Sequence, residues 1–287
     1  MDNIFYAVVV LYNQTINDSL TCNNLKKIIN HNIKVIIADN SIIPTDNNKH
    51  CFDNDWVYVS MGGNLGLSKA YNRVLDIIDD NSGIVIWFDD DTNITQEYFD
   101  ELEKKVRLNK SVDIFAPVIY GQDGKIYSPN EARFFKNKQL RKAKDVLNMK
   151  KFNAINSCTA VRLKVYKNYR YNEHIFLDQV DHNFFEDQRS YGRNFLKLNV
   201  VIHHNFSLKS KQKSSQQCWN RYKIMIPDFL IFCSKSKIRL FLGIIKVIGW
   251  GFREALNYHD IKFIWSCFSY GIICIKNKKL YAVNKLL

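Results

Sequence analysis

The chain has 287 residues, of which 46% are hydrophobic, so it can bury a large core and is not a disordered protein. Its seven cysteines are odd in number and form no CxxC pair, which argues against a disulfide framework or a zinc site and favours a reducing cytoplasm. The formal net charge of +13 is unevenly placed: residues 208–287 hold 15 Lys or Arg against three acids, a net of +12, and the first 207 residues are close to neutral.

Strand and helix patterns alternate along the first 92 residues. Apolar runs rich in β-branched and aromatic residues predict buried strands over 5–11, 34–38, 57–59 and 84–88. Helices are expected over 18–30, with Asn17 or Asp18 as N-cap, and over 67–78. This order predicts an α/β fold with a Rossmann-like, mostly parallel sheet. Later patterns predict helices over 96–108 and from about 180 to Gly192, and strands over 114–120, within 154–164 and over 196–202.

Polar residues follow the four predicted strands, at the sheet edge where open α/β sheets bind ligands. The strand 84–88 runs directly into Asp89, Asp90 and Asp91. In an extended chain, Asp89 and Asp91 share one side while Asp90 points elsewhere. Carboxylates held this close favour a divalent cation with a phosphate ligand. A solvated acidic turn that caps the helix beginning near Ile94 is the alternative.

Three other groups have both a functional and a structural interpretation. The glycine-bearing segment 62–72 follows a strand and opens a helix, so its backbone can approach a phosphate or sugar, but it matches neither GxGxxG nor the P-loop. Asp39 can accept a hydrogen bond from a base or ribose, or it is an ordinary turn residue. Of His203 and His204, at most one can serve as a metal ligand, because neighbours in a strand point to opposite sides; both can also be surface residues.

Asp181 lies beside Val180 and two aromatic residues, Phe184 and Phe185. A carboxylate in such an apolar setting suits a general base. An N-cap, or a salt bridge to Arg189 or Arg193, is the alternative.

Taken in order, these motifs resemble the inverting GT-A glycosyltransferases of family 2, particularly the rhamnosyltransferase-like branch of bacterial polysaccharide assembly. The resemblance covers roughly residues 5–207. It rests on Val9–Asn13, Asp39–Ser41, Gly63–Gly66 through Asn72, Phe88–Thr92, Phe176–Asp181 through Gly192, and residues 204–207.

The resemblance implies a nucleotide-sugar site at the predicted edge. Tyr12 and Asn13 would line the nucleotide pocket, Asp39 would bind a pyrimidine base, and Asn64 with Gly66 would pack near base and ribose. The complete set of donor-binding candidates is Tyr12, Asn13, Asp39, Asn40, Asn64, Gly66, Asn72, Asp89 and Asp90. The family's DxD is represented by Asp89–Asp91, so Asp89, Asp91 and His204 would hold Mn²⁺ or Mg²⁺.

The same resemblance makes Asp181 the catalytic base. Val180 stands where many family members have Glu, as in the rhamnosyltransferase-like branch. Asp187 replaces the arginine usually found six residues after the base, so no role is carried over to that position. Asn156, Ser157 and Asp178 are candidates for binding the acceptor.

We therefore expect a metal-dependent transferase that moves a sugar from dTDP-rhamnose, or from a UDP-hexose, to a hydroxyl of a lipid-linked glycan in capsule or O-antigen assembly. Residues 1–207 would form the GT-A catalytic domain, with a nucleotide-sugar half over about 1–92 and an acceptor half over about 93–207. Residues 208–287 would form a basic, mainly helical extension. Its lysines and aromatic residues predict peripheral attachment to the inner face of the cell membrane. Packing on the catalytic domain or on the second subunit of a homodimer is the alternative.

Two other classes of protein are less compatible with the sequence. A nucleotidyltransferase would carry a glycine-rich, basic loop after the first strand, where this chain has Tyr12, Asn13 and Gln14. A nucleic-acid-binding protein would use the basic extension but leave the acidic triplet and Asp181 unexplained. No nucleic-acid partner is expected.

Overall fold

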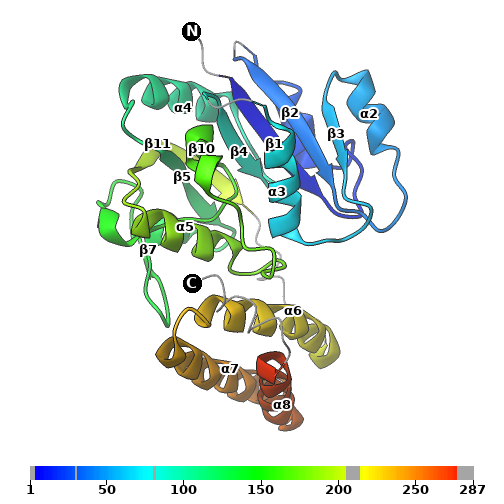
Figure 1. Cartoon of the computed structure of the whole chain (residues 1–287), viewed down its shortest axis with the longest axis vertical. Coiled ribbons are helices and arrows are strands. Elements are labelled where there is room, and N and C mark those ends of the chain that lie inside the picture. Colours follow the sequence, from blue (N-terminus) through cyan, green and yellow to red (C-terminus); the bar gives the residue numbers. More distant parts are fainter. Residues whose placement is uncertain (1–3, 30, 80–81, 205–213, 277–287) are drawn as a thin grey trace. The chain divides into compact units, whose positions relative to one another are not determined.

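The computed structural model describes residues 4–29, 31–79, 82–204 and 214–276 (Figure 1). The chain divides into two compact units. The first consists of Met1–Tyr171 and Phe184–Ser207, and the second of Asn172–Asn183 and Leu208–Leu287. Asn205–Ser207, the end of the last motif quoted above, and Asn30, the expected end of the first helix, lie outside the described residues.

An eight-stranded sheet forms the centre of the first unit, with strand order β11-β5-β10-β4-β1-β2-β3 and β6 paired to β5. Parallel pairs join β1 to β2 and β4, β2 to β3, and β5 to β11, whereas β10 is antiparallel to both of its neighbours. The predicted Rossmann-like, mostly parallel sheet is therefore confirmed. The strands are β1 (Phe5–Leu11), β2 (Ile33–Asp39), β3 (Val57–Ser60), β4 (Ile84–Phe88), β5 (Ile114–Gly121), β6 (Ile126–Ser128), β10 (Thr159–Arg162) and β11 (Phe195–His204).

Strand β4 is apolar throughout because it lies between β1 and β10 and is covered on both faces. All five of its side chains are buried. Its parallel register with β1 runs from Phe5 opposite Ile84 to Val9 opposite Phe88. The chain therefore leaves the sheet at Asp89, at the edge where β1 and β2 also end.

Helices cover this sheet, and one of them shows how the core is built. In α4 (Gln96–Leu108) the buried residues Tyr98, Phe99, Leu102 and Val106 recur at helical spacing. Phe99 packs edge-on against Phe5 of β1, and Tyr98 against Phe88 of β4. The other helices of this unit are α1 (Leu20–Leu25), α2 (Asn47–Asp53) and α3 (Leu67–Ile77), and α5 (Val180–Ser190) begins in the second unit and continues into the first.

The first helix is where the sequence-based prediction was wrong. Its N-cap is Ser19, whose Oγ accepts a hydrogen bond from the backbone N–H of Cys22 at 3.2 Å. Asp18 instead accepts a hydrogen bond from the Thr15 hydroxyl, at 2.7 Å, in the turn before the helix. The helix is also shorter than expected and ends at Leu25. The other predicted helices and strands are present, with small shifts at their ends.

The structure contains several elements that the sequence did not indicate. Besides α2 they include a small antiparallel sheet and short 3-10 helices. These are β7 (Asn130–Glu131), β8 (Lys138–Gln139), β9 (Phe152–Asn153), η1 (Met149–Lys151) and η2 (Leu163–Asn168).

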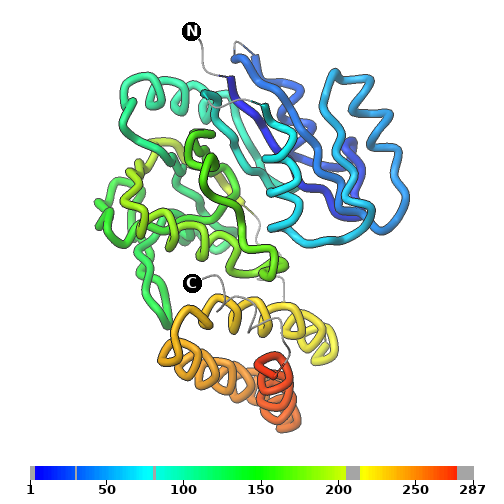
Figure 2. The backbone as a smooth tube through the Cα atoms, viewed as in Figure 1, coloured from blue at the N-terminus to red at the C-terminus, as the bar shows by residue number. Residues whose placement is uncertain are grey.

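Three long helices make up most of the second unit: α6 (Ser215–Cys233), α7 (Lys237–Tyr258) and α8 (Lys262–Lys276). They pack on one another, and Figure 2 shows α7 and α8, in orange and red, lying side by side. None of the helices within the described ranges combines the length and the hydrophobicity that a membrane-spanning segment needs.

Candidate donor and metal site

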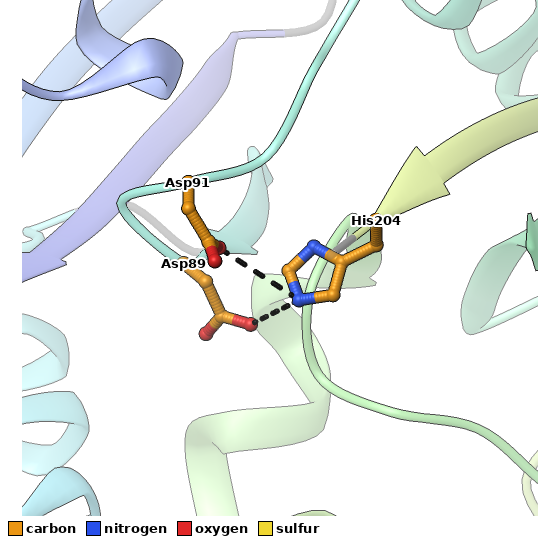
Figure 3. A group of neighbouring side chains, drawn as sticks. All are labelled: Asp89, Asp91 and His204. Atoms are coloured by element: carbon orange, nitrogen blue, oxygen red, sulfur yellow. Dashed lines mark ion pairs between the residues drawn. The ribbon is translucent and has the colours of Figure 1, made fainter. Parts of the chain in front are cut away.

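The three predicted metal ligands come together just beyond the carboxyl end of β4. His204 Nε2 lies 3.6 Å from a carboxylate oxygen of Asp89 and 3.7 Å from one of Asp91 (Figure 3). One ligand atom from each residue can be chosen so that all three lie within 4.8 Å of one another. Asp90 is not part of this group. The chain turns at these residues, so Asp89 and Asp91 converge through a turn and not through the alternation of an extended strand.

The position of His204 follows from the alternation of β11. Leu198, Val200, Ile202 and His204 are buried, and the residues between them are exposed. His203 consequently points away and lies against the ring of Tyr120, with 5.8 Å between ring centroids. Of the two histidines, only His204 lies beside the acidic residues, and its role as a metal ligand stays a prediction.

Two hydroxyl residues at the start of α1 hold the acidic turn. Ser19 Oγ donates to the backbone carbonyl of Asp90 at 2.7 Å, and Thr21 Oγ1 donates to that of Asp89 at 2.5 Å. The Thr21 hydroxyl also accepts from the N–H of Thr92 at 2.8 Å. These hydrogen bonds fix the backbone of the turn that carries Asp89 and Asp91.

The charges in this turn favour a bound cation. Burial, and then the neighbouring carboxylates of Asp91 and Asp89, raise the pKa of Asp90 to about 6. The side chains of Asp89 and Asp91 are 44% and 47% exposed, so an ion can reach them, while that of His204 is 6% exposed. Two carboxylates and one imidazole are a ligand set that suits Mn²⁺, and the carboxylates also suit Mg²⁺.

Next to this group, the ends of β1 and β2 are tied together by Asn13. Its backbone adopts a positive φ of 50°, and its N–H donates to Ser41 Oγ at 2.8 Å. Its side-chain oxygen accepts from the N–H groups of Ile42 and Ile43 at 2.9 and 3.1 Å. The preceding Tyr12 is exposed. The predicted nucleotide-lining pair therefore lies at this edge, with Tyr12 free to contact a ligand.

Asp39 is almost fully buried at the end of β2 and serves the structure as a turn residue. Its carboxylate accepts hydrogen bonds from the N–H of Ser41, the hydroxyls of Thr45 and Tyr58, and the amide of Asn47, at 2.8 to 3.2 Å. Burial alone would raise the pKa of Asp39, but the hydrogen bonds from Ser41, Asn47 and Thr45 outweigh it and lower the pKa. Binding of a pyrimidine base by this carboxylate stays a prediction.

The remaining donor-binding candidates differ in the hydrogen bonds that they form within the protein. Asn40 donates to the side-chain oxygen of Asn64 at 3.1 Å, and that oxygen also accepts from the N–H of Gly66. Gly66 has a φ of 90°, which favours glycine, and α3 begins directly after it. Asn72 pairs its amide with the backbone N–H and carbonyl of Tyr171, both at 2.9 Å. Asn72 therefore joins α3 to a later segment of the chain.

The acceptor candidates lie in two places. Ser157 reaches the acidic turn, since its hydroxyl is 3.0 Å from that of Thr92. Asn156 is buried, and neither side-chain amide atom has a hydrogen-bond partner among the described residues. Asp178 belongs to the second unit and forms a bidentate ion pair with Arg221. Asp181, the candidate base, lies in the first turn of α5 and accepts from the N–H of His182 at 2.7 Å.

Sequence reasoning missed the residues that hold these groups in place. Ser19 and Thr21 were available as signals, because hydroxyl residues at a helix start commonly bond to nearby backbone. Asp228 of α6, whose carboxylate accepts hydrogen bonds from the backbone N–H groups of residues 176–178, was also missed. It stands alone in an apolar run, which indicates a buried carboxylate with a specific partner.

The mostly parallel sheet, with an acid–histidine group at the carboxyl end of β4, is a fold of the GT-A type. The sequence profile described as Glycosyl transferase family 2 matches residues 6–170, and the chain belongs to this family. It is therefore a glycosyltransferase. No curated protein sequence matches the chain.

Solved structures share the fold at low sequence identity. The mannosyltransferase PcManGT from Pyrobaculum calidifontis, in complex with GDP-Man and Mn²⁺, has a TM-score of 0.54 and 13% identity, over 98% of this chain and 88% of that one. Residues 1–349 of S. aureus TarS in complex with UDP have a TM-score of 0.51 and 13% identity, over 85% and 69%.

Proposed function

We propose that this glycosyltransferase is metal-dependent and inverting, and that it transfers a sugar from a nucleoside diphosphate donor to an acceptor hydroxyl. The observation that carries the proposal is the convergence of Asp89, Asp91 and His204 at the sheet edge where β1 and β2 end, at Leu11 and Asp39. A bound Mn²⁺ or Mg²⁺ would supply positive charge against the diphosphate leaving group.

Asp181 is the proposed base. Its carboxylate removes the proton of the acceptor hydroxyl while that oxygen forms a bond to the anomeric carbon. The bond from the anomeric carbon to the diphosphate breaks on the opposite face, so the anomeric configuration inverts and no covalent sugar intermediate forms. The apolar residues that accompany Asp181 in α5, Phe184 and Phe185, are fully buried and fix the helix that carries it.

Two substitutions test the proposal. Asp181→Asn should lower the transfer rate by about 10²- to 10⁴-fold and leave donor binding unchanged, since only the proton acceptor is lost. Asp187→Asn, the same change on the same helix, is the control. Asp91→Ala should abolish the Mn²⁺ dependence of donor binding in calorimetry. Near wild-type turnover by Asp181→Asn, or unchanged Mn²⁺ dependence in Asp91→Ala, would contradict the corresponding assignment.

For the donor, we propose a dTDP- or UDP-sugar, with dTDP-rhamnose favoured. The support is the resemblance to the rhamnosyltransferase-like branch at Val180 and Asp181, and the position of Asp39 at the end of β2. A thermal-shift panel of dTDP- and UDP-sugars with Mn²⁺ tests this. Stabilisation by a GDP-sugar alone would rule out a pyrimidine donor.

For the acceptor, we propose a lipid-linked glycan of surface polysaccharide assembly, such as capsule or O-antigen, reached at the inner face of the cell membrane. The support lies in the second unit. Five exposed apolar residues recur at helical spacing along one side of α7: Ile238, Phe241, Ile245, Phe252 and Leu256. We call this set the apolar stripe of α7.

The charge of the same region fits an anionic membrane surface, because residues 208–287 carry a net charge of +12. The full chain should therefore bind vesicles that contain phosphatidylglycerol more strongly than vesicles of phosphatidylcholine alone. Equal binding to both vesicles would remove the electrostatic part of the proposal.

A further inference from the structure

A buried carboxylate of α6 binds the segment that leads into the candidate base. Asp228 is 1% exposed and accepts hydrogen bonds from three consecutive backbone N–H groups, those of Phe176, Leu177 and Asp178, each at 2.8 Å. A carboxylate that accepts several N–H bonds is a strong, directional anchor. All of these residues belong to the second unit.

The side chain of Asp178 is held by the same helix. Arg221 forms two hydrogen bonds to its carboxylate, at 2.5 and 2.6 Å. Arg221 and Asp228 are seven residues apart, which is close to two helical turns, so both lie on one side of α6. The segment 176–178 is therefore bound at its backbone and at one side chain by two residues of a single helix. We call this pair the α6 clamp.

The segment that the α6 clamp binds ends at Asp178, one residue before α5 begins. Gln179, the residue between them, has a positive φ of 67°, a conformation that non-glycine residues adopt only when the surrounding structure enforces it. Asp181 follows in the first turn of α5. The direction of this first turn, and with it the carboxylate of Asp181, depends on the backbone that Asp228 and Arg221 hold.

The burial of the Asp228 carboxylate supports a functional interpretation of the α6 clamp. Burial raises the pKa of Asp228 to about 6, although the three N–H groups that it accepts act in the other direction. The two carboxylate oxygens of Asp228 nevertheless serve as acceptors for all three N–H groups. A buried carboxylate adds little to the free energy of unfolding, because the cost of its desolvation offsets much of the gain from its hydrogen bonds.

We propose that Arg221 and Asp228 are positioning residues for the transfer reaction, and that α6 is part of the catalytic apparatus and not only an attachment for the basic extension. This inference rests on the proposed role of Asp181 as the base. The clamp acts through Asp181, so its loss should lower turnover and leave donor binding unchanged.

The test compares Asp228→Asn and Arg221→Lys in the full-length protein. Asn has one acceptor oxygen and an NH₂ group that faces the same N–H donors, so at least one of the three loses its partner. Lys keeps the charge of Arg but cannot form the bidentate pair. We expect kcat for nucleoside diphosphate release from dTDP-rhamnose, or from the sugar nucleotide that the panel selects, to fall about 100-fold in Asp228→Asn and about 10-fold in Arg221→Lys. The KM for the donor should stay unchanged.

A matched control comes from the same unit. Asp260 accepts a hydrogen bond from the backbone N–H of Lys262 at the start of α8, so Asp260→Asn makes the same chemical change at another backbone anchor. It should leave kcat unchanged. Hydrogen exchange of the amides of residues 176–178 should accelerate in Asp228→Asn and not in Asp260→Asn.

Asp181→Asn separates the inference from the function on which it rests. If Asp181→Asn is inactive while Asp228→Asn and Arg221→Lys both turn over like the wild type, the clamp does not position the base. If Asp181→Asn is active, the proposed base is wrong, whatever the clamp variants do. Adding Arg221→Lys to Asp181→Asn should lower the residual rate no further, because the two residues act through the same group. If Asp228→Asn fails to fold, Arg221→Lys decides the question alone.

Discussion

Thr21 connects the acidic turn to the first helix through one hydroxyl group. It donates to the carbonyl of Asp89 and accepts from the N–H of Thr92, on the two sides of the carboxylate pair. Replacing a group that orients a metal ligand commonly lowers the metal affinity as strongly as replacing some of the ligands themselves. The geometry of Asp89 and Asp91 therefore depends on a residue that carries no charge and lies outside the group of Asp89, Asp91 and His204.

Thr21→Val keeps the shape of the side chain and removes the hydroxyl. We expect the Mn²⁺ concentration needed for half-maximal donor binding to rise about 10-fold or more, because the acidic turn loses its fixed backbone. Thr15→Val is the control, since Thr15 bonds to Asp18 in an exposed turn. Isothermal titration of Mn²⁺ in the presence of the donor measures the effect. Equal Mn²⁺ affinity in both variants would show that the turn needs no such support.

At the scale of elements, helices and strands with a strong apolar pattern could be predicted from the sequence, and those with a weak pattern could not. The bounds of β1, β4 and α4 follow from the sequence because each is a continuous or periodic apolar run. Helix α2, with the sequence NNKHCFD, has no such period, and β10 cannot be recognised as antiparallel from its own residues. The convergence of Asp89, Asp91 and His204 was predictable from their places after strands. The α6 clamp was not, because it joins residues about fifty positions apart.

The packing of α7 on α8 depends on one glycine. A Cβ at Gly251 would lie 3.0 Å from the Cα of Ile264 and 3.1 Å from the Cβ of Cys267, whereas a Cβ at Gly249 would have no atom within 4 Å. Gly251→Leu should force the two helices apart and lower the free energy of unfolding by about 1–3 kcal/mol. Gly249→Leu should leave it unchanged or raise it, since leucine favours helix over glycine. Calorimetric melting of both variants measures this, and equal melting temperatures would contradict the close approach.

At the scale of the whole molecule, the second unit combines most of the net positive charge with the apolar stripe of α7. Some of its cations are used in packing: Lys246 lies over the rings of Phe229 and Trp250, at 4.8 and 5.7 Å from their centroids. Burial lowers the pKa of Lys246 accordingly. The apolar stripe of α7 lies opposite the side that packs, where Gly243, Val247, Gly251 and Glu254 are buried. One helix thus offers a packed side and an exposed apolar side.

The exposed stripe gives the membrane proposal its sharpest test. Replacing Phe241 and Phe252 together by Glu removes two exposed aromatic side chains and adds two negative charges on one side of α7. Binding to vesicles that contain phosphatidylglycerol should fall at least about 10-fold, because both the apolar and the electrostatic contributions are lost. Phe52→Glu is the control, since Phe52 is 86% exposed on α2 of the first unit and outside the basic region. Flotation of the full-length variants measures binding. If the double variant floats like the wild type but changes from dimer to monomer in sedimentation, the stripe joins two copies of the chain and the membrane proposal is wrong.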